Sequence, residues 1–539
     1  MAGLKLSKIN DANVKKEFKD KGYVLPSYDR DEVKALTSRE PAWVHFGTGN
    51  IFRAFPAAVI DNLLNQGVYD KGVIAVEGFD YDIISKAYKP FDDLSLLVTL
   101  KSDGNIDKRV VGSVTESLTA DFAREADLAR LIEIFTAPSL QMVSFTITEK
   151  GYSLNGPDGS LSGIVKDDFD NKCFPPKHLM GKMAYLLHER YKAGACPVAM
   201  ASMDNCSHNG DKLKAAVYAY ADKWCEQGLV DAGFISYLKD EKKISFPLSM
   251  IDKITPRPDA DVVKMLEKDG FEDTDIIVTD KHTYTAAFVN AEETQYLVVE
   301  DKFPNGRPPF DKGGVYFTDR ETVDKVEKMK VCTCLNPLHT ALAIFGCLLS
   351  YDSIWKEMKD EDLSAFVRDM GYMEGMPVVI NPGIIKPETF IDEVLNKRLV
   401  NPFMPDTPQR IACDTSQKLP IRFGETLKAY IREGEDVTSL RYIPVVLAGY
   451  LRYLTGINDE GNDFEKSPDP LLEELSGIMA PYKDYKKAGK DALKPILSRK
   501  DIFAVDLYEA GLAGRITDLF NEMNEGPGKV REVLHRTVS

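Results

Sequence analysis

The sequence has little positive charge relative to its negative charge. Its 539 residues include 68 Lys and Arg against 84 Asp and Glu, which gives a formal net charge of −16. Nucleic acids and anionic membranes attract basic surfaces, so we expect neither of them as a partner. The net charge does not exclude a small anionic substrate, because a local group of Lys and Arg can bind one inside an acidic protein.

Long apolar runs and a cysteine framework are also missing. No uninterrupted apolar run reaches about 18 residues, the length expected of a transmembrane helix. The first residues contain no apolar segment of signal-peptide length. Eight cysteines are scattered along the chain, a pattern typical of reduced thiols in an intracellular protein. We therefore expect a cytoplasmic location.

Two patterns of hydrophobicity divide the chain, which is too long for one ordinary core. Up to about residue 320, helical patterns alternate with short apolar segments, at 43–46, 72–80, 141–152 and 197–205. This alternation is typical of a doubly wound α/β domain. Further along, helical spacing prevails and strand patterns nearly vanish. The sequence predicts an N-terminal extension at 1–37, an α/β domain at 38–320 and a mostly α-helical C-terminal domain at 321–539.

A glycine turn follows the first expected strand, in "GTGNIFRA". Gly47 and Gly49 have the spacing that permits a tight turn and lets backbone N–H groups approach a pyrophosphate. Phe52 stands where the third glycine of a dinucleotide-binding motif would be. An ordinary strand–turn–helix is therefore an open alternative.

Two carboxylates end the second expected strand. Glu77 and Asp80 follow the glycine turn at a distance where a carboxylate can accept hydrogen bonds from the adenosine ribose of a dinucleotide. The same charge repels the 2′-phosphate of NADP, which favours NAD as the cofactor. The alternative for Glu77 is a solvated strand end.

The stretch "KVCTCLNPLHT" (330–340) groups a lysine, an asparagine and a histidine. Asn336 followed by proline predicts a helix N-cap, with His339 in the first helical turn and on the same side. A lysine in a partly apolar pocket suits a general base, and Asn and His side chains can stabilise an alkoxide. Lys330, Asn336 and His339 therefore predict hydride-transfer chemistry without a metal.

Two other interpretations of this stretch stay open. The first is a capped helix whose Lys330 lies on a solvated face. The second is a metal site built from Cys332, Cys334 and His339. Cys-x-Cys seldom directs both thiols at one ion and no fourth ligand is evident, so we expect no metal.

Several separated blocks together resemble the polyol-specific long-chain dehydrogenases, the mannitol dehydrogenase family. That family includes mannitol 2-dehydrogenase, fructuronate reductase and tagaturonate reductase. The blocks lie between about residue 42 and 425: "HFGTGNIFRAF", "FTITEKGY", "SMDNCSHNG", "FPLSMIDKITP", "YLVVEDKFPNGRPPF", "EKMKVCTCLNPLH" and "RIACDTSQKLP". Two positions depart from the family pattern. Lys253 stands where Arg is usual, and five residues separate Lys330 from Asn336 where the family usually has four.

The resemblance implies roles for individual residues. Lys330 would be the general base, assisted by Glu327, while Asn205 and Asn336 would stabilise the oxyanion and His339 would bind substrate. Arg410 and Lys418 would hold substrate hydroxyls or a carboxylate, and nearby Arg422 would add to their suitability for a carboxylate. The cofactor-binding residues implied are Gly47, Gly49, Asn50, Ile51, Phe52, Arg53, Glu77, Asp80, Glu149 and Asp252. Plainer roles are open for some of them: Asn205 could bridge a loop, Arg410 and Lys418 could be surface charges, and Asp252 could brace a domain junction.

The resemblance also implies a fold and an activity. The fold is a Rossmann-type NAD-binding domain followed by a helical domain for substrate and catalysis. The activity is NAD-dependent, metal-independent interconversion of a keto-sugar acid and its alcohol, preferably fructuronate and mannonate, in a monomer or small homo-oligomer. Tagaturonate/altronate or mannitol are alternative substrates. A non-catalytic protein that binds sugar acids or nucleotides is the alternative from a different class.

Overall fold

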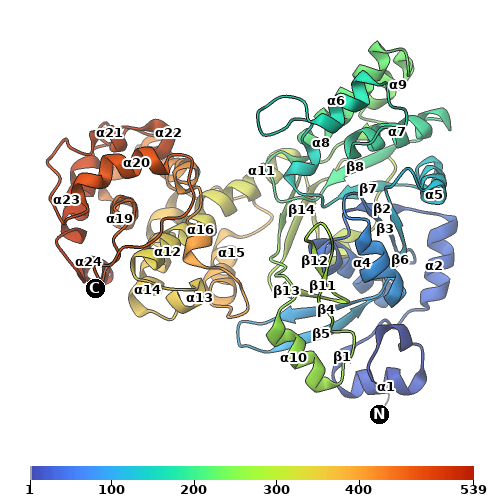
Figure 1. Ribbon diagram of the computed structural model, residues 1–539, viewed down its shortest axis with the longest axis horizontal. Coiled ribbons are helices and arrows are strands. Elements are labelled where there is room, and N and C mark those ends of the chain that lie inside the picture. Colours follow the sequence, from blue (N-terminus) through green and yellow to red (C-terminus); the bar gives the residue numbers. More distant parts are fainter. Residues whose placement is uncertain (1–2) are drawn as a thin grey trace. The chain divides into compact units, whose positions relative to one another are not determined.

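The computed structural model describes residues 3–539 and divides the chain into two compact units (Figure 1). The first unit contains the residues up to 101 and residues 105–323, and the second contains 324–539 together with 102–104. The predicted domain limits at residues 37 and 320 stay predictions.

The first unit is built on a six-stranded parallel sheet. Its strands run in the order β6 (Val114–Thr119), β3 (Val73–Glu77), β2 (Trp43–Phe46), β7 (Met142–Phe145), β8 (Val198–Ser202) and β9 (Ile244–Ser245). The central strands are mostly apolar and fully buried, as expected for a parallel sheet covered on both faces. The predicted Rossmann-type sheet is confirmed. The strand order reverses between β2 and β7, where such sheets bind ligands.

Helices cover both faces of this sheet. Because successive side chains of a strand point to opposite faces, Val44 packs with α5 (Glu125–Thr136), α7 (Leu179–Lys192) and α8 (Asn209–Glu226), whereas Trp43 packs with α4 (Pro56–Asn65). The other helices of the unit are α1 (Ala12–Asp20), α2 (Arg30–Arg39), α3 (Asn50–Ala54), α6 (Gly163–Asp170), α9 (Ala232–Lys239) and α10 (Ala260–Asp269).

Three smaller sheets were not expected from the sequence. One has the order β1 (Tyr23–Val24), β5 (Ile106–Val111), β4 (Ser95–Leu100), β13 (Phe288–Glu292). A second has the order β10 (Ser249–Asp252), β14 (Tyr296–Glu300), β15 (Tyr316–Thr318). The third is a two-stranded sheet in which β11 (Ile277–Val278) pairs with β12 (Tyr284–Thr285). Strand β1 lies within residues 1–37, so this segment adds a strand to a sheet.

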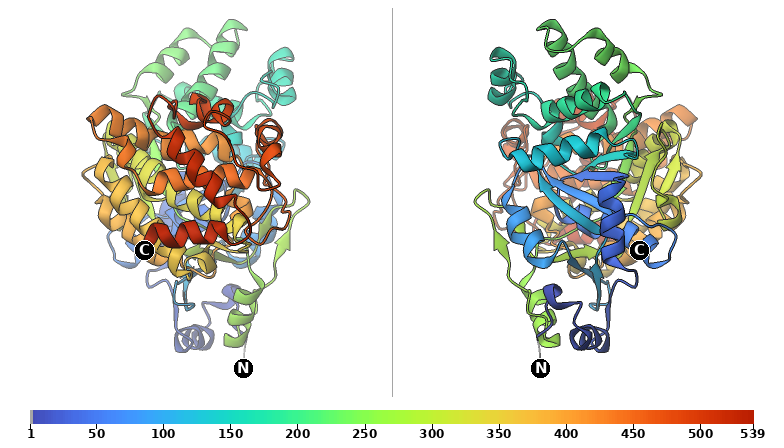
Figure 2. Two further views of the ribbon diagram at one scale, coloured as in Figure 1. Left: turned by 90° about the vertical axis from the view of Figure 1, so that its left-hand side faces the viewer. Right: turned by 90° about the vertical axis from the view of Figure 1, so that its right-hand side faces the viewer.

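The second unit is helical (Figure 2), and between residues 324 and 539 the structure contains no named strand. Its centre is α19 (Tyr442–Leu454), every residue of which is buried and which packs against α12 (Asn336–Leu348) and α23 (Ala513–Met523). The remaining helices are α13 (Ile354–Glu357), α14 (Glu361–Asp369), α15 (Pro387–Glu393), α16 (Pro408–Ile411), α17 (Thr415–Leu419), α18 (Glu425–Glu433), α20 (Leu472–Met479), α21 (Lys494–Leu497), α22 (Lys500–Phe503) and α24 (Lys529–Val538). The predicted helical C-terminal domain is confirmed.

A long helical run passes from one unit into the other. Helix α11 (Arg320–Met329) begins in the first unit and continues through a further turn into α12 of the second. The run Arg320–Leu348 is long and apolar enough to cross a membrane by length and composition. However, 78% of its apolar window is buried inside the protein, as in the core helix of a globular domain.

Candidate active site

The glycine turn joins β2 to α3, and its two glycines serve different purposes. Gly47 has φ +102, and a Cβ there would lie 2.1 Å from the carbonyl oxygen of Thr146, so only glycine fits. Gly49 has an ordinary φ of −74, and a Cβ on it would meet nothing within 4 Å. Gly47 therefore shapes the turn, whereas the space beside Gly49 is open, and contact of either glycine with a cofactor stays a prediction.

An aromatic pair supports the turn where a third glycine is usual. Phe52 is buried and its ring stacks on His45, with centroids 4.1 Å apart and planes at 8°. The His45 ring hydrogen-bonds to the hydroxyls of Ser144 (2.6 Å) and Thr146 (2.8 Å), and Thr146 donates to the carbonyl oxygen of Gly47 (3.1 Å). Burial lowers the pKa of His45 to about 3, so the ring is neutral.

The other predicted residues of α3 also hold the turn in place. Arg53 is buried and donates to the carbonyl oxygen of Ala286 (2.7 Å) and to the side chains of Asn50 (2.9 Å) and Thr285 (3.2 Å). Ile51 packs at the edge of the same core. Contact of Asn50, Ile51, Phe52 or Arg53 with a cofactor stays a prediction.

Glu77 connects the turn to the loop after β3. One carboxylate oxygen accepts from the backbone N–H (3.1 Å) and the hydroxyl of Thr48, and the other accepts from the backbone N–H groups of Phe79 (2.8 Å) and Asp80 (3.1 Å). The Asp80 carboxylate accepts from the hydroxyl of Thr279. Both predicted ribose-binding carboxylates are buried and already accept hydrogen bonds within the chain.

Three further predicted residues of the first unit lie beyond β7 and β8. Glu149 is exposed and forms an ion pair with Lys212 of α8. Asn205 is exposed in the loop after β8. Asp252 is buried at the end of β10. Their predicted contacts with cofactor and substrate stay predictions.

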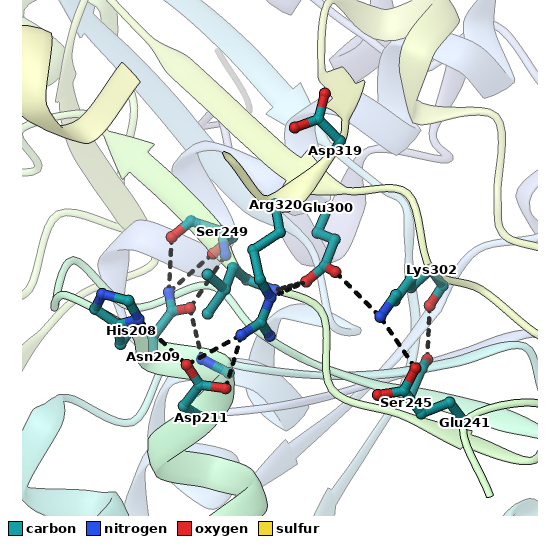
Figure 3. Close-up of polar contacts among 12 residues, drawn as sticks. His208, Asn209, Asp211, Glu241, Ser245, Ser249, Glu300, Lys302, Asp319 and Arg320 are labelled. Atoms are coloured by element: carbon teal, nitrogen blue, oxygen red, sulfur yellow. Dashed lines mark hydrogen bonds and ion pairs between the residues drawn. The ribbon is translucent and has the colours of Figure 1, made fainter. Parts of the chain in front are cut away.

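Ion pairs hold the start of α11 against the first unit (Figure 3). Arg320, the first residue of α11, donates to both carboxylate oxygens of Asp211 (3.0 and 3.1 Å) and to the carboxylate of Glu300 (3.1 Å). Glu300 is buried and also accepts from the backbone N–H of Leu248 (3.1 Å). Nearby, the buried amide of Asn209 donates to Ser249 (3.0 Å). The network positions the N-terminal end of the helix that leads to Lys330.

The segment from Lys330 to Cys334 forms a π-helical turn between α11 and α12. The N–H of Leu335 donates to the carbonyl oxygen of Lys330 (3.1 Å), an i→i+5 bond that encloses one residue more than an α-helical turn. Lys330 is buried, and Glu327 lies one turn before it. The turn accommodates the fifth residue between Lys330 and Asn336, and α11 and α12 continue on either side of it.

The predicted cap of α12 is off by one residue. Leu335 occupies the N-cap position without a side-chain hydrogen bond, and Asn336 is the first helical residue, followed by Pro337. At Leu335 the backbone leaves the helical region, with φ −127 and ψ −63, so Leu335 and not Asn336 precedes the first residue of α12. Asn336 and His339 nevertheless lie three residues apart on α12, as predicted.

His339 is surrounded by cationic side chains of the second unit. Burial, and then the positive charges of Arg422, Arg410, Arg398 and Lys418, lower its pKa to about 3. Its Nε2 lies 3.4 Å from the carboxylate of Asp406 but makes no hydrogen bond within the described chain. The contact lacks hydrogen-bond geometry, and the pKa of His339 is low. Both observations indicate that the His339 ring is neutral and does not form an ion pair with Asp406.

Three of these cations have hydrogen-bond partners of different kinds. Arg410 pairs with Asp406, whereas Lys418 donates to the backbone carbonyl oxygens of Ile411 (3.0 Å) and Cys413. Arg422 donates to the hydroxyl of Thr340, and burial lowers its pKa to about 10. Sequence reasoning found Arg410, Lys418 and Arg422 but missed Arg398 and Asp406, which stand in segments without a recognisable motif.

The alternative metal site has little support in the second unit. Burial raises the pKa of Cys332 to about 11 and that of Cys334 to about 12, which disfavours the thiolate form that binds metals. Within residues 3–539 no group of three or more His, Cys, Asp or Glu side chains is placed to hold an ion. Metal independence stays a prediction.

Comparison with known families gives matches for both units. Residues 41–312 match the family described as mannitol dehydrogenase Rossmann domain, and residues 322–524 match the mannitol dehydrogenase C-terminal domain. The chain is 52% identical over 517 residues to D-mannonate oxidoreductase of Thermotoga maritima, which covers 95% of each protein.

Two solved structures are similar over nearly the whole chain. A substrate-free D-sorbitol dehydrogenase matches with a TM-score of 0.78 and 26% identity, covering 95% of this chain and 97% of the other. The mannitol 2-dehydrogenase of Pseudomonas fluorescens, solved as a ternary complex with NAD and D-mannitol, matches with a TM-score of 0.66 and 25% identity, covering 96% of each.

Proposed function

The chain belongs to the mannitol dehydrogenase family, and we propose that it interconverts a keto-sugar acid and its alcohol with NAD as the cofactor. Membership makes it a dehydrogenase that acts on a CH–OH group of a polyol or sugar acid. We propose fructuronate and mannonate as its substrate pair, with tagaturonate and altronate as the alternative pair. We further propose a cytoplasmic enzyme that works as a monomer or small homo-oligomer.

The proposal that the substrate is a sugar acid rests on the group of cations around His339. Arg398, Arg410, Arg422 and Lys418 all act electrostatically on that ring. Lys418 donates to backbone carbonyl oxygens and Arg422 donates to the hydroxyl of Thr340, and neither kind of partner carries a negative charge. A substrate carboxylate would supply negative charge where charge-assisted hydrogen bonds are strong. A neutral polyol would bring no negative charge to these cations. The 52% identity to a mannonate oxidoreductase supports the same choice.

The choice of NAD rests on the glycine turn and on the end of β3. A Cβ on Gly49 would meet nothing within 4 Å, which leaves room for a pyrophosphate beside the backbone, and the carboxylates of Glu77 and Asp80 would repel the 2′-phosphate of NADP. The related mannitol 2-dehydrogenase was solved with NAD. The residues at this edge of the sheet therefore fit the cofactor.

Lys330 would move the proton of the reaction. A bound nicotinamide cofactor would supply the hydride, and the ammonium group of Lys330 would donate its proton to the carbonyl oxygen as the alcohol forms. In the oxidative direction the neutral amine would take that proton back. Asn205 and Asn336 would donate hydrogen bonds to the oxygen while it carries negative charge, and the neutral His339 would bind a substrate hydroxyl.

The first test follows NADH absorbance with fructuronate, tagaturonate and fructose, in the presence of EDTA. We expect oxidation with a uronate, a loss on the order of a thousandfold in kcat in K330A, and unchanged NADH binding by that variant. Turnover abolished by EDTA, or retained in K330A, would contradict the proposed mechanism. NADH binding without turnover of any substrate by the wild-type protein would favour the non-catalytic alternative.

A second variant separates a sugar acid from a neutral polyol. Arg422→Met removes one cation beside His339, so kcat/KM for the uronate should fall by roughly tenfold or more, as expected for a lost charged hydrogen bond. Fructose has no carboxylate, so its kcat/KM should change little. Equal losses for both substrates would show that Arg422 acts through the fold and would remove the main argument for an acid. The similarity to sorbitol and mannitol dehydrogenases makes a neutral polyol the second candidate.

A further inference from the structure

Phe79 is an apolar side chain in an unusual position. It is 68% exposed, more than any other large hydrophobic residue in the described part of the chain. It stands two residues after the end of β3, in the loop where the adenosine half of a dinucleotide lies in folds of this class. A large exposed ring at that place has no role in the core or in the mechanism derived above.

The loop that carries Phe79 is held firmly in place. The backbone N–H of Phe79 donates to Glu77 (2.8 Å), whose other oxygen accepts from Thr48 of the glycine turn. The ring is therefore connected through one carboxylate to the site proposed for the pyrophosphate. A solvent-exposed ring on an anchored backbone is a surface already formed for stacking.

The β11–β12 hairpin holds the same loop from the other side. Thr279 donates its hydroxyl to Asp80, and Lys281 donates to the carbonyl oxygen of Phe79. The ammonium of Lys281 lies 4.1 Å from the centroid of the Phe79 ring, within the range of a cation–π contact. A second contact within the hairpin, from the N–H of Thr283 to the hydroxyl of Thr279 (3.1 Å), fixes the turn that presents Lys281.

We propose that Phe79 is the stacking platform for the adenine ring of the cofactor, positioned by Glu77 and by Lys281 of the β11–β12 hairpin. Adenine presents a flat π-face, and aromatic side chains bind such faces by stacking. The inference rests on the proposed use of a nicotinamide adenine dinucleotide. It goes beyond it, because it assigns recognition of one half of that molecule to a named side chain and hairpin.

The test measures binding of cofactor fragments by titration calorimetry on the full chain. The ligands are NADH, AMP and reduced nicotinamide mononucleotide, and the variants are Phe79→Ala, Phe79→Leu and Phe79→Tyr. We expect Phe79→Ala to raise the Kd for AMP and NADH about tenfold, at the low end of what stacking contributes. Phe79→Leu should bind AMP weakly as well, because it keeps apolar area without a π-face, whereas Phe79→Tyr should restore binding. Binding of the mononucleotide should not change.

A matched control removes an exposed ring of the β11–β12 hairpin. Tyr284 is 39% exposed and also pairs with a cation, Arg257, 4.6 Å from its ring centroid. Tyr284→Ala should leave the Kd for AMP within about twofold of the wild-type value. An unchanged Kd for AMP in Phe79→Ala, or equal effects of Phe79→Ala and Tyr284→Ala, would overturn the assignment while leaving the proposed function intact. A wild-type protein that binds neither NADH nor AMP would overturn both.

Discussion

At the scale of single residues, two histidines are kept neutral by different surroundings. His45 lies between two hydroxyls under the glycine turn, and His339 lies among cations on α12. Burial is the main cause of the low pKa in both, about 3 in each. Each can donate or accept one hydrogen bond per nitrogen without carrying charge, which suits a support for a turn and a ligand for a substrate hydroxyl.

The low pKa of these histidines predicts acid sensitivity. Between the ordinary histidine pKa of about 6.5 and the folded value of about 3, the unfolded chain binds more protons than the folded one, so stability falls as pH falls. At pH 5 each histidine should cost about 2 kcal/mol relative to pH 8. Urea unfolding at the two pH values measures this loss.

The His45→Gln variant tests the contribution of one ring. Glutamine does not titrate, so the variant should lose less stability between pH 8 and pH 5 than the wild-type protein, by about 2 kcal/mol, even if it is less stable at both. An identical pH-dependent loss in variant and wild type would mean that His45 becomes protonated in the folded state or that other groups dominate.

At the scale of elements, the π turn decides how α11 and α12 join. One extra residue within a helix is accommodated by a local i→i+5 turn, and the helices on either side keep their faces. In an uninterrupted α-helix, one added residue would rotate everything beyond it by about 100°. Five residues separate Lys330 from Asn336 instead of the usual four. The π turn explains how both residues could still act in one site, as predicted.

Deleting one residue from the π turn should be tolerated. Removal of Val331 would convert the turn to an α-helical one and give the spacing usual in the family, so activity should stay within about tenfold of wild type. The matched control deletes Lys325 from the regular helix α11, which rotates Lys330 by about 100° relative to the start of the helix and should abolish turnover. Steady-state kinetics measures both, and circular dichroism reports whether each variant folds. Two equally inactive, folded variants would refute this account of the turn.

At the scale of the whole molecule, the predicted ligand-binding groups are divided between two units with separate cores. The glycine turn, Glu77 and Phe79 belong to the first unit, and Lys330, Asn336, His339 and the cations belong to the second. A ligand that resembles only the cofactor should therefore order a different part of the chain from a ligand that resembles only the substrate.

Hydrogen–deuterium exchange can test this division. AMP alone should protect backbone amides of the glycine turn and of residues 77–81, and mannonate alone should protect the start of α12 and the segment 406–422, because binding suppresses local opening. Each ligand should leave the other set within experimental error. Protection of the second unit by AMP alone would show that the units do not respond separately.

The sequence could predict those features whose residues lie close together along the chain. Strands β2, β3, β7 and β8 are mostly apolar, which is why they were recognised, whereas β1 and β11 have two residues each and β5 mixes charged with apolar residues. Lys330, Asn336 and His339 follow one another closely and could be grouped by spacing. Arg398 and Asp406 reach His339 only through the packing of distant segments, and no local pattern reveals a π turn.

The shared carboxylate of Glu77 has a consequence for how a cofactor would come and go. Because its oxygens bind the glycine turn and the Phe79 loop at once, neither can shift without breaking hydrogen bonds to the other. The conformational entropy of this edge of the sheet is lost once, when the chain folds, rather than at every association event. Exchange of spent for fresh cofactor between turnovers could then proceed on a surface that does not have to rearrange.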